Sequence, residues 1–294
     1  PFVRIAVLLA ALLVLGMALR LTLCRHAGPS VGPLPEIIQP QGIDMGVKDG
    51  TKLYETPFDW DLLNIKSNHY SYVSRGRTIS KLGVDVSEHN ASIDWPKVKA
   101  DGVSFAYIRI GYRGSVAGNI AMDARFKENF AAAQQAGLSI GVYFFSQATT
   151  VQEAREEADF VAKTLAGANL AYPVAFDMEP ATDGTDRLGK LTSSEFTAIA
   201  KAFCERCESN GYRAVIYGNQ YDLSMYDLTQ LRQFGYWYAE YDYRPTMDLR
   251  FGLWQYTTKG EVDGIRGTVD LDLDLTQVIT EADGTPNAAE GVQG

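Results

Sequence analysis

Two carboxylates stand two residues apart in an otherwise apolar run, and this spacing points to chemistry. The run reads Val174-Ala175-Phe176-Asp177-Met178-Glu179. Alternate side chains of a β-strand face opposite sides, so Asp177 and Glu179 share one face, roughly 7 Å apart. Neighbouring like charges disfavour double ionisation, which leaves one acid protonated beside one carboxylate. A protonated acid beside a carboxylate is what the hydrolysis of a glycosidic bond requires.

Two further acids lie in similar short apolar runs. Asp85 lies within GVDVS at 83–87, and Asp270 lies within GTVDL at 267–271. The D-x-D-x-D pattern that begins at Asp270 resembles a calcium loop, but Leu275 occupies the position where such a loop needs glycine. We therefore expect a strand with acidic side chains at this place, and no metal site.

Aromatic residues near the same predicted strand ends are candidates for contacts with sugar rings. Tyr and Trp rings offer a large apolar face and retain a polar atom. The substrate-binding candidates are Tyr143, Tyr217, Trp237, Tyr241, Trp254 and, as the one cation, Arg109. Ordinary core packing is the alternative for the aromatic residues, and we expect Tyr143 and Tyr217 to be the exposed ones.

Apolar runs and helical periodicity alternate between residues 81 and 280. The predicted strands are Leu82–Val86, Val103–Ile110, Leu138–Phe145, Tyr172–Glu179, Arg213–Tyr217, Tyr236–Tyr241, Phe251–Tyr256 and Thr268–Leu275. Helices are predicted at Asp123–Ala136, after Thr150, after Thr192 and, as a short piece, at Asp227–Gln233. Helical connections first and strands last predict a parallel α/β barrel with an irregular final part, whose active site lies at the carboxyl ends of the strands.

Sequence blocks between Leu82 and Leu275 resemble the family 25 glycoside hydrolases, the lysozymes (N-acetylmuramidases) that cut peptidoglycan. In chain order they are GVDVS (83–87), IDW (93–95), FAYIRIGYRG (105–114), DARFKENFAAAQQAGLSIGVYFF (123–145), YPVAFDMEP (172–180), WQYT (254–257) and GIRGTVDLD (264–272). The resemblance implies an irregular TIM-like barrel, (β/α)5(β)3. It also implies that Glu179 is the general acid, that Asp177 is its partner carboxylate, and that Asp85 and Asp270 complete the site without any cofactor.

The implied reaction is cleavage of the β-1,4 bond between N-acetylmuramic acid and N-acetylglucosamine in peptidoglycan. Either Asp177 or the N-acetyl oxygen of the substrate itself would then stabilise the transition state. A non-catalytic cell-wall-binding module on the same fold is the alternative, and hydrolysis of another glycan is a third. A chitinase of family 18 would show a longer D-x-x-D-x-D-x-E run, which residues 172–179 lack.

Composition and charge limit the partners. The chain of 294 residues has 27 basic and 36 acidic residues and a net charge of −9. This balance argues against nucleic-acid binding, which needs basic surface. The three cysteines provide no disulfide framework. We expect Cys204 and Cys207, a C-x-x-C pair within a predicted helix, to pack in the core, and we expect a monomer.

The amino-terminal part has the character of a targeting segment. Residues 5–19 carry no charge, and residues 5–24 would cross a membrane as a single anchor helix. A cleaved signal and a soluble helix are the alternatives. We predict an anchor or signal at 1–25, a stem at 26–80, the catalytic barrel at 81–280 and a disordered tail at 281–294. This organisation predicts an extracytoplasmic, membrane-anchored enzyme, or a secreted one if the segment is cleaved.

Overall fold

The computed structural model describes residues 40–241 and 243–284. The predicted anchor at 1–25, with its membrane segment at 5–24, lies outside the described residues, as do residues 285–294 of the predicted tail. None of the helices within the described part of the chain is both long enough and apolar enough to span a bilayer.

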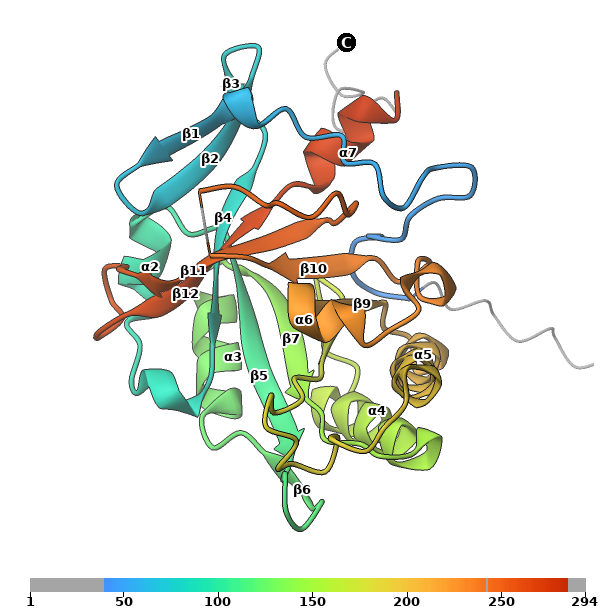
Figure 1. The fold of residues 1–294 in the computed structure, drawn as a ribbon. Coiled ribbons are helices and arrows are strands. Elements are labelled where there is room, and N and C mark those ends of the chain that lie inside the picture. The colour runs from blue at the N-terminus through green and yellow to red at the C-terminus, as the bar shows by residue number, and fades with distance from the viewer. Residues whose placement is uncertain (1–39, 242, 285–294) are drawn as a thin grey trace, which may run out of the picture. The chain divides into compact units, whose positions relative to one another are not determined.

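Eight strands form a closed barrel (Figure 1). They are β4 (Lys81–Val86), β5 (Phe105–Arg113), β7 (Ser139–Phe145), β8 (Val174–Asp177), β9 (Ala214–Asn219), β10 (Tyr236–Ala239), β11 (Leu253–Gly260) and β12 (Val269–Asp274). The order around the barrel is β4-β12-β11-β10-β9-β8-β7-β5, and pairing of β4 with β5 closes it. All eight predicted strands are confirmed.

The last strand departs from the predicted parallel arrangement. Strand β12 runs antiparallel to both of its neighbours, β11 and β4, whereas the other barrel pairs are parallel. The reason is the short connection 261–268, because a parallel neighbour requires a crossover of a dozen or more residues, whereas a hairpin does not. A further short strand, β6 (Ile120–Met122), pairs antiparallel with residues 111–113 at the end of β5, beyond the residues of β5 that pair with β4.

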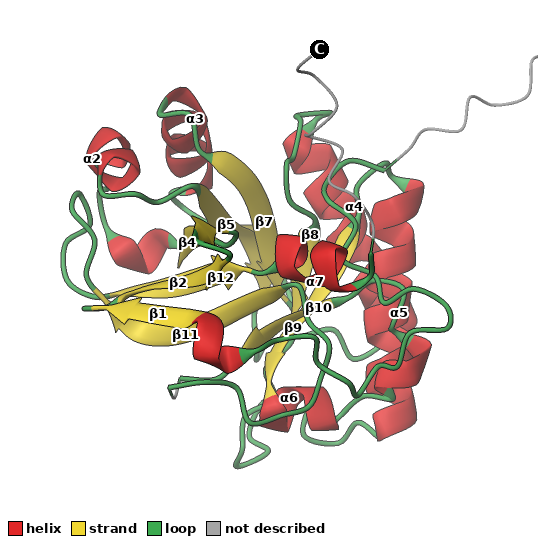
Figure 2. Ribbon diagram, turned by 90° about the horizontal axis from the view of Figure 1, so that it is seen from above, coloured by secondary structure: helices red, strands yellow, loops and turns green. Residues whose placement is uncertain are grey.

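Helices surround the first part of the barrel, as Figure 2 shows for α3, α4 and α5. The helices are α2 (Trp95–Ala100), α3 (Phe126–Gln135), α4 (Val151–Leu165), α5 (Ser193–Ser209), α6 (Gln220–Ser224) and α7 (Thr276–Ala282). The hydroxyls of Thr150 and Thr192 accept the backbone N–H of Glu153 and Glu195 and so begin α4 and α5, as predicted. The helical piece predicted at Asp227–Gln233 is a single 3-10 turn, η3 (Leu228–Gln230).

The alternation of side chains in each strand separates an outer core from an inner core. On β8, Val174 and Phe176 belong to the outer cluster beneath the helices, whereas Ala175 belongs to the inner cluster. Cys204 and Cys207 lie buried in α5 as free thiols. Burial raises the pKa of both thiols, so they stay protonated at neutral pH. The prediction that they pack in the core is confirmed.

Residues 40–58 run across the base of the barrel, at the amino ends of the strands. The N–H groups of Ile43 and Val47 donate to carbonyls just before β8 and β10, at 3.0 and 2.8 Å. Between them, the Met45 side chain joins the inner core. Gly235 has a φ of +75° and faces the Met45 carbonyl at the place where a Cβ would stand, so only glycine fits there.

A three-stranded antiparallel sheet covers the barrel where it lacks helices. It consists of β1 (Leu63–Lys66), β2 (His69–Ser74) and β3 (Arg77–Thr78), and it lies beside β11 and β12 in both views (Figures 1 and 2). Tyr70 stacks on Tyr256 of β11 at 4.2 Å between centroids, and Trp60 of η1 (Trp60–Leu62) meets Trp254 at 5.4 Å.

The predicted domain boundary at residue 81 is therefore corrected. The stem is predicted at 26–80, but the part of it that the structure describes, residues 40–80, folds against the barrel and belongs to the same compact unit as the described barrel residues. The sequence of this segment has no long helical or strand periodicity, because its residues are fixed by contacts with the barrel rather than by a regular element of their own.

Candidate active site

A cavity of about 330 Å³ opens among the carboxyl ends of the strands. Its lining includes every predicted site residue except Trp254: Asp85, Arg109, Tyr143, Asp177, Glu179, Tyr217, Trp237, Tyr241 and Asp270. These side chains come from seven different strands or the loops after them, so closure of the barrel brings together residues that are far apart in the sequence.

Asp177 and Glu179 lie at the end of β8. Asp177, the last residue of the strand, is 4% exposed, whereas Glu179 beyond it is half-buried. Their carboxyl groups hydrogen-bond to each other. Burial raises the pKa of both groups, and the nearby charge of Glu179 raises that of Asp177 further. The contact raises the pKa of Asp177 and lowers that of Glu179, but burial still holds the pKa of Glu179 above its usual value, and the more exposed Glu179 lines the cavity.

Asp85 is held in place by a glutamine that bridges three residues. Asp85 lies near the end of β4 directly opposite Asp270 of β12. The amide nitrogen of Gln255 donates to Asp85 Oδ2 at 2.6 Å. The amide oxygen of Gln255 accepts the hydroxyls of Tyr217 and Tyr241, each at 2.8 Å. This bridge fixes the Asp85 carboxylate and two aromatic walls relative to one another.

Charge in the cavity is mainly negative. Burial, with a smaller effect of the Glu179 charge, raises the pKa of Asp270 to about 6. Arg109 is the cation of the lining, and its guanidinium already pairs with Asp123 at 2.8 Å and Glu88 at 3.1 Å. Arg109 therefore reaches the cavity as a positioned cation whose charge is largely compensated. Crowded acids that retain protons near neutral pH suit acid catalysis.

Aromatic rings form the walls around the acids. Trp237 is buried, and the rings of Tyr217 and Tyr143 meet it edge-on at 4.8 and 6.5 Å between centroids. Tyr143 is half-buried and Tyr217 is 8% exposed, so the expectation that both are exposed is wrong for Tyr217. The Tyr217 hydroxyl instead donates a hydrogen bond to the buried Gln255 side chain. Tyr241 is 52% exposed, so its ring is the accessible aromatic surface at the rim of the cavity.

Trp254 does not belong to the cavity, which corrects its prediction as a substrate-binding residue. It is fully buried on the outer face of β11, where its ring packs against Trp60 and its Nε1 donates to the Glu240 carbonyl at 2.9 Å. Alternation along β11 turns Gln255 inward and Trp254 outward. Sequence reasoning missed Gln255, Ser87, His89 and Phe145 in the lining. The same alternation could have indicated Gln255.

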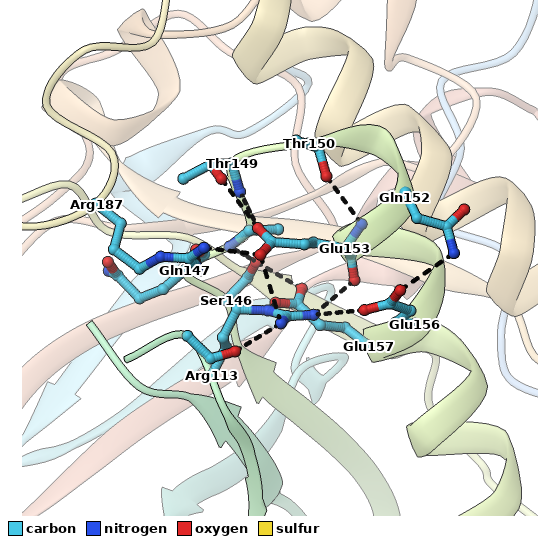
Figure 3. A network of polar contacts seen from close by, with 12 residues as sticks. Arg113, Ser146, Gln147, Thr149, Thr150, Gln152, Glu153, Glu156, Glu157 and Arg187 are labelled. Carbon is cyan, nitrogen blue, oxygen red and sulfur yellow. Dashed lines mark hydrogen bonds and ion pairs between the residues drawn. The ribbon is translucent and has the colours of Figure 1, made fainter. Parts of the chain in front are cut away.

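The loop that follows Glu179 is tied to the start of α4 by the network in Figure 3. Arg187 of this loop donates to Glu153 and to the Gln147 carbonyl, both at 2.7 Å. Deeper in the network, Arg113 donates to Glu157 at 2.6 Å. Burial raises the pKa of Glu157 to about 7 in spite of this partner. The network thereby fixes the loop that follows Glu179 to the residues at the start of α4.

Comparison with known sequences identifies a family and two characterised relatives. Residues 84–265, more than half of the chain, match "Glycosyl hydrolases family 25". The autolytic lysozyme of Clostridium acetobutylicum is 27% identical over 193 residues, which cover 65% of this chain and 54% of that protein. Lysozyme M1 of Streptomyces globisporus is 27% identical over 277 residues, which cover 90% of this chain and 88% of that protein. The chain thus spans about half the length of the Clostridium relative.

Solved structures share the fold. The bacterial lysozyme of Streptomyces coelicolor superposes with a TM-score of 0.57 at 25% identity, over 70% of this chain and 98% of that one. The autolysin LytC of Streptococcus pneumoniae, solved in complex with a synthetic peptidoglycan ligand, gives a TM-score of 0.59 at 21% identity, over 72% of this chain and 51% of that one. The predicted (β/α)5(β)3 barrel is consistent with these folds.

Proposed function

Since the chain belongs to the glycosyl hydrolases of family 25, we propose that it is a lysozyme that cuts the β-1,4 bond between N-acetylmuramic acid and N-acetylglucosamine in peptidoglycan. The observation that carries the proposal is the pair of neighbouring carboxyl groups, Asp177 and Glu179, whose pKa burial raises, at the end of β8 within an aromatic-walled cavity. The lysozymes named above support the choice of substrate.

Glu179 is the general acid of the proposed reaction. Its raised pKa keeps it protonated where an ordinary glutamate is ionised, and its half-buried position lets it reach the departing glycosidic oxygen. Proton transfer leaves positive charge on the anomeric carbon and ring oxygen, which the negative charge of the surrounding acids stabilises.

Asp177 acts as the partner carboxylate. A carboxylate that attacks the sugar stands about 5–5.5 Å from the acid across the ring. The carboxyl group of Asp177 instead hydrogen-bonds to that of Glu179 and lies on the same side. This arrangement supports the route in which the N-acetyl oxygen of the substrate attacks, while Asp177 orients the acetamido group and takes up charge. Asp85 and Asp270 complete the negative surface around the sugar. Water then attacks the anomeric carbon of the intermediate formed by the N-acetyl oxygen, breaks the bond between them and gives its proton to the ionised Glu179.

The place of action follows from the substrate. Peptidoglycan lies outside the cytoplasmic membrane, so the proposed enzyme works in the extracytoplasmic space. The anchor predicted at 5–24 would hold it at the membrane surface as a monomer that acts on glycan strands, and secretion after cleavage at that segment remains the alternative.

The proposal is tested by digestion of purified peptidoglycan with the full chain, followed by mass spectrometry of the new reducing ends. We expect N-acetylmuramic acid ends, and a loss of about 10²–10⁴-fold in rate for Glu179→Gln, because the general acid is removed. Glu205→Gln, on the exposed face of α5, serves as the matched control and should cleave normally.

Each other result points to a different function. Reducing N-acetylglucosamine ends would show a glucosaminidase. Wall binding without cleavage by the folded parent would show a binding module, the alternative function. Equal activity of Glu179→Gln and the parent would remove Glu179 from the role of general acid.

A further inference from the structure

Asp272 is a buried acid beneath the cavity, outside the four acids assigned to the reaction. It lies on β12, two residues beyond Asp270, and it is 0% exposed. Its Oδ1 accepts the Nε1–H of Trp237 at 2.8 Å. Its Oδ2 is buried and receives no N–H or hydroxyl from any residue that the structure describes. An unpartnered buried carboxylate oxygen is costly, so this atom needs an explanation.

The strand register places Asp272 beside Asp85. On the antiparallel pair β4 and β12, Asp270 lies opposite Asp85 and Asp272 lies opposite Gly83. Residues two apart on a strand share a face, so Asp272 and Asp85 are diagonal neighbours inside the barrel. Gly83 contributes no side chain between them, and the Phe105 ring fills the space where its Cβ would stand. Asp272 and Asp85 are therefore close neighbours, and the charge of Asp272 raises the pKa of Asp85.

Two neighbouring buried carboxyl groups can hydrogen-bond to each other only when one of them carries a proton. Burial raises the pKa of both Asp85 and Asp272, and the charge of Asp270 raises both further. Of the two basic side chains in the lining, Arg109 and His89, the Arg109 guanidinium is paired with Asp123 and Glu88. The other titratable groups that face the pair are Asp177 and Glu179 from β8 and its loop, Asp270 and Asp274 from β12, and Tyr107, Tyr143, Tyr172, Tyr217, Tyr241 and Tyr256.

We propose that Asp272 is a positioning residue that shares one proton with Asp85, so that the two carboxyls together carry one negative charge and Asp85 is held toward the substrate. Trp237 fixes Asp272 on one side, and Gln255 fixes Asp85 on the other. The chain from Trp237 to Gln255 continues to the hydroxyls of Tyr217 and Tyr241. Asp272 thereby orders an acid and two sugar-binding rings without touching substrate. The consequence for the rate rests on the proposed glycosidase function.

The first test compares two substitutions at Asp272. In Asp272→Asn, the amide nitrogen donates to Asp85 permanently and the amide oxygen still accepts Trp237, so the variant imitates the protonated form. We expect its kcat on soluble glycan strands to stay within about threefold of the parent. In Asp272→Leu the donor is lost, and we expect kcat to fall more than about tenfold while KM changes little, because Asp85 loses its orientation.

Asp274 provides the matched control on the same strand. It is equally buried, but it faces the base of the barrel, where Tyr172 and Thr276 donate to it. Asp274→Asn and Asp274→Leu should both lower the free energy of unfolding, and the two variants should have similar kcat values. Equal losses of kcat in Asp272→Asn and Asp272→Leu would overturn the proposal, since the proton would then have no role.

A second measurement tests the shared proton without catalysis. Carbon-13 NMR of aspartate-labelled full chain, with assignment by the single variants, follows the carboxyl groups of Asp85 and Asp272 against pH. We expect the two to titrate together, and we expect the Asp85 pKa to fall in Asp272→Asn because a permanent donor favours its ionised form. Two carboxyls that ionise independently in an active parent would overturn the pairing alone. A shared titration in an inactive parent would overturn the proposed function and leave the pairing intact.

Discussion

Single acids in this protein differ mainly in how deeply each is buried and in which charges face it. Burial raises the pKa of both Asp177 and Glu179, and the positive charge of Arg109, which lowers the pKa of Asp177, offsets this effect only in part. Asp85 and Asp270 lie opposite each other on neighbouring strands, where both face the same cavity. The chemistry proposed for Glu179 therefore depends on the neighbouring acids as much as on its own position.

A substitution at Asp222, which does not line the cavity, tests how far neighbouring acids influence Asp177 and Glu179. Asp222 lies in α6, where it accepts the Asn219 N–H at 3.1 Å, and burial raises its pKa to about 7. Above that pH its charge adds to the repulsion that raises the pKa of Asp177. Asp222→Asn removes this charge, so we expect the alkaline limb of kcat/KM to move to lower pH, while the rate at the optimum stays close to that of the parent.

Rates measured from pH 4 to 9 check the prediction. Asp227→Asn is the control, because Asp227 is an exposed cap of η3 that does not line the cavity. A limb that stays in place in Asp222→Asn, or that moves to higher pH, would contradict the assigned electrostatic influence.

At the scale of elements, the barrel has two kinds of outer cover. Helices α3, α4 and α5 cover the early strands, as in a regular α/β barrel, whereas β11 and β12 are covered by the small sheet β1–β3 (Figure 2). The apolar outer face of β11 carries Trp254 and Tyr256, and these rings need a partner because no helix follows β11. The sheet and the residues of η1 supply that partner.

Tyr70 tests the contribution of this cover. Its ring stacks on Tyr256 with an interplanar angle of 10° and also contacts Trp254. We expect Tyr70→Ala to lower the free energy of unfolding by about 1–3 kcal/mol, below the range for a fully buried aromatic because Tyr70 is half-buried. Urea unfolding measures the loss. Tyr54→Ala, at a ring that is 52% exposed, should change stability by less than about 0.5 kcal/mol. Equal effects of the two substitutions would show that the sheet contributes little.

At the scale of the whole molecule, buried acids make stability depend on pH. Burial raises the pKa of Glu157 and of Asp222 to about 7 and that of Asp270 to about 6. Unfolded aspartate and glutamate titrate near 4, so between roughly pH 4.5 and 7 the folded chain binds more protons than the unfolded chain. The free energy of unfolding therefore falls as the pH rises through this window.

We expect the free energy of unfolding to be at least about 2 kcal/mol higher at pH 5.5 than at pH 8. Urea titrations at the two pH values measure the difference. Asp270→Asn should reduce it, whereas Asp263→Asn, at an exposed loop residue, should leave it unchanged. A stability that is flat or that rises over this range would show that these acids are not held in their protonated forms.

The sequence by itself determined the barrel and most of the site. The alternation of Val174, Ala175 and Phe176 specifies which face of β8 is inside, and this is a local property of an extended chain. The two threonine caps and the apolar runs mark the helices and strands for the same local reason. Because parallel strands end at one face of a barrel, the acids at the ends of the first and fourth strands could be predicted to meet. Asp270 stands near the start of the last strand and reaches the same face because β12 is antiparallel.

Only the tertiary structure decided features that depend on contacts between distant segments. The antiparallel direction of β12, the outward face of Trp254 and the cover provided by residues 40–80 all arise where the barrel lacks helices. Asp272 and Asp85 lie on strands that are far apart in the chain but pair in the barrel, where both side chains are buried. Spacing along a sequence records which residues share a face, but closure of the barrel determines which of them become neighbours and how little water reaches them.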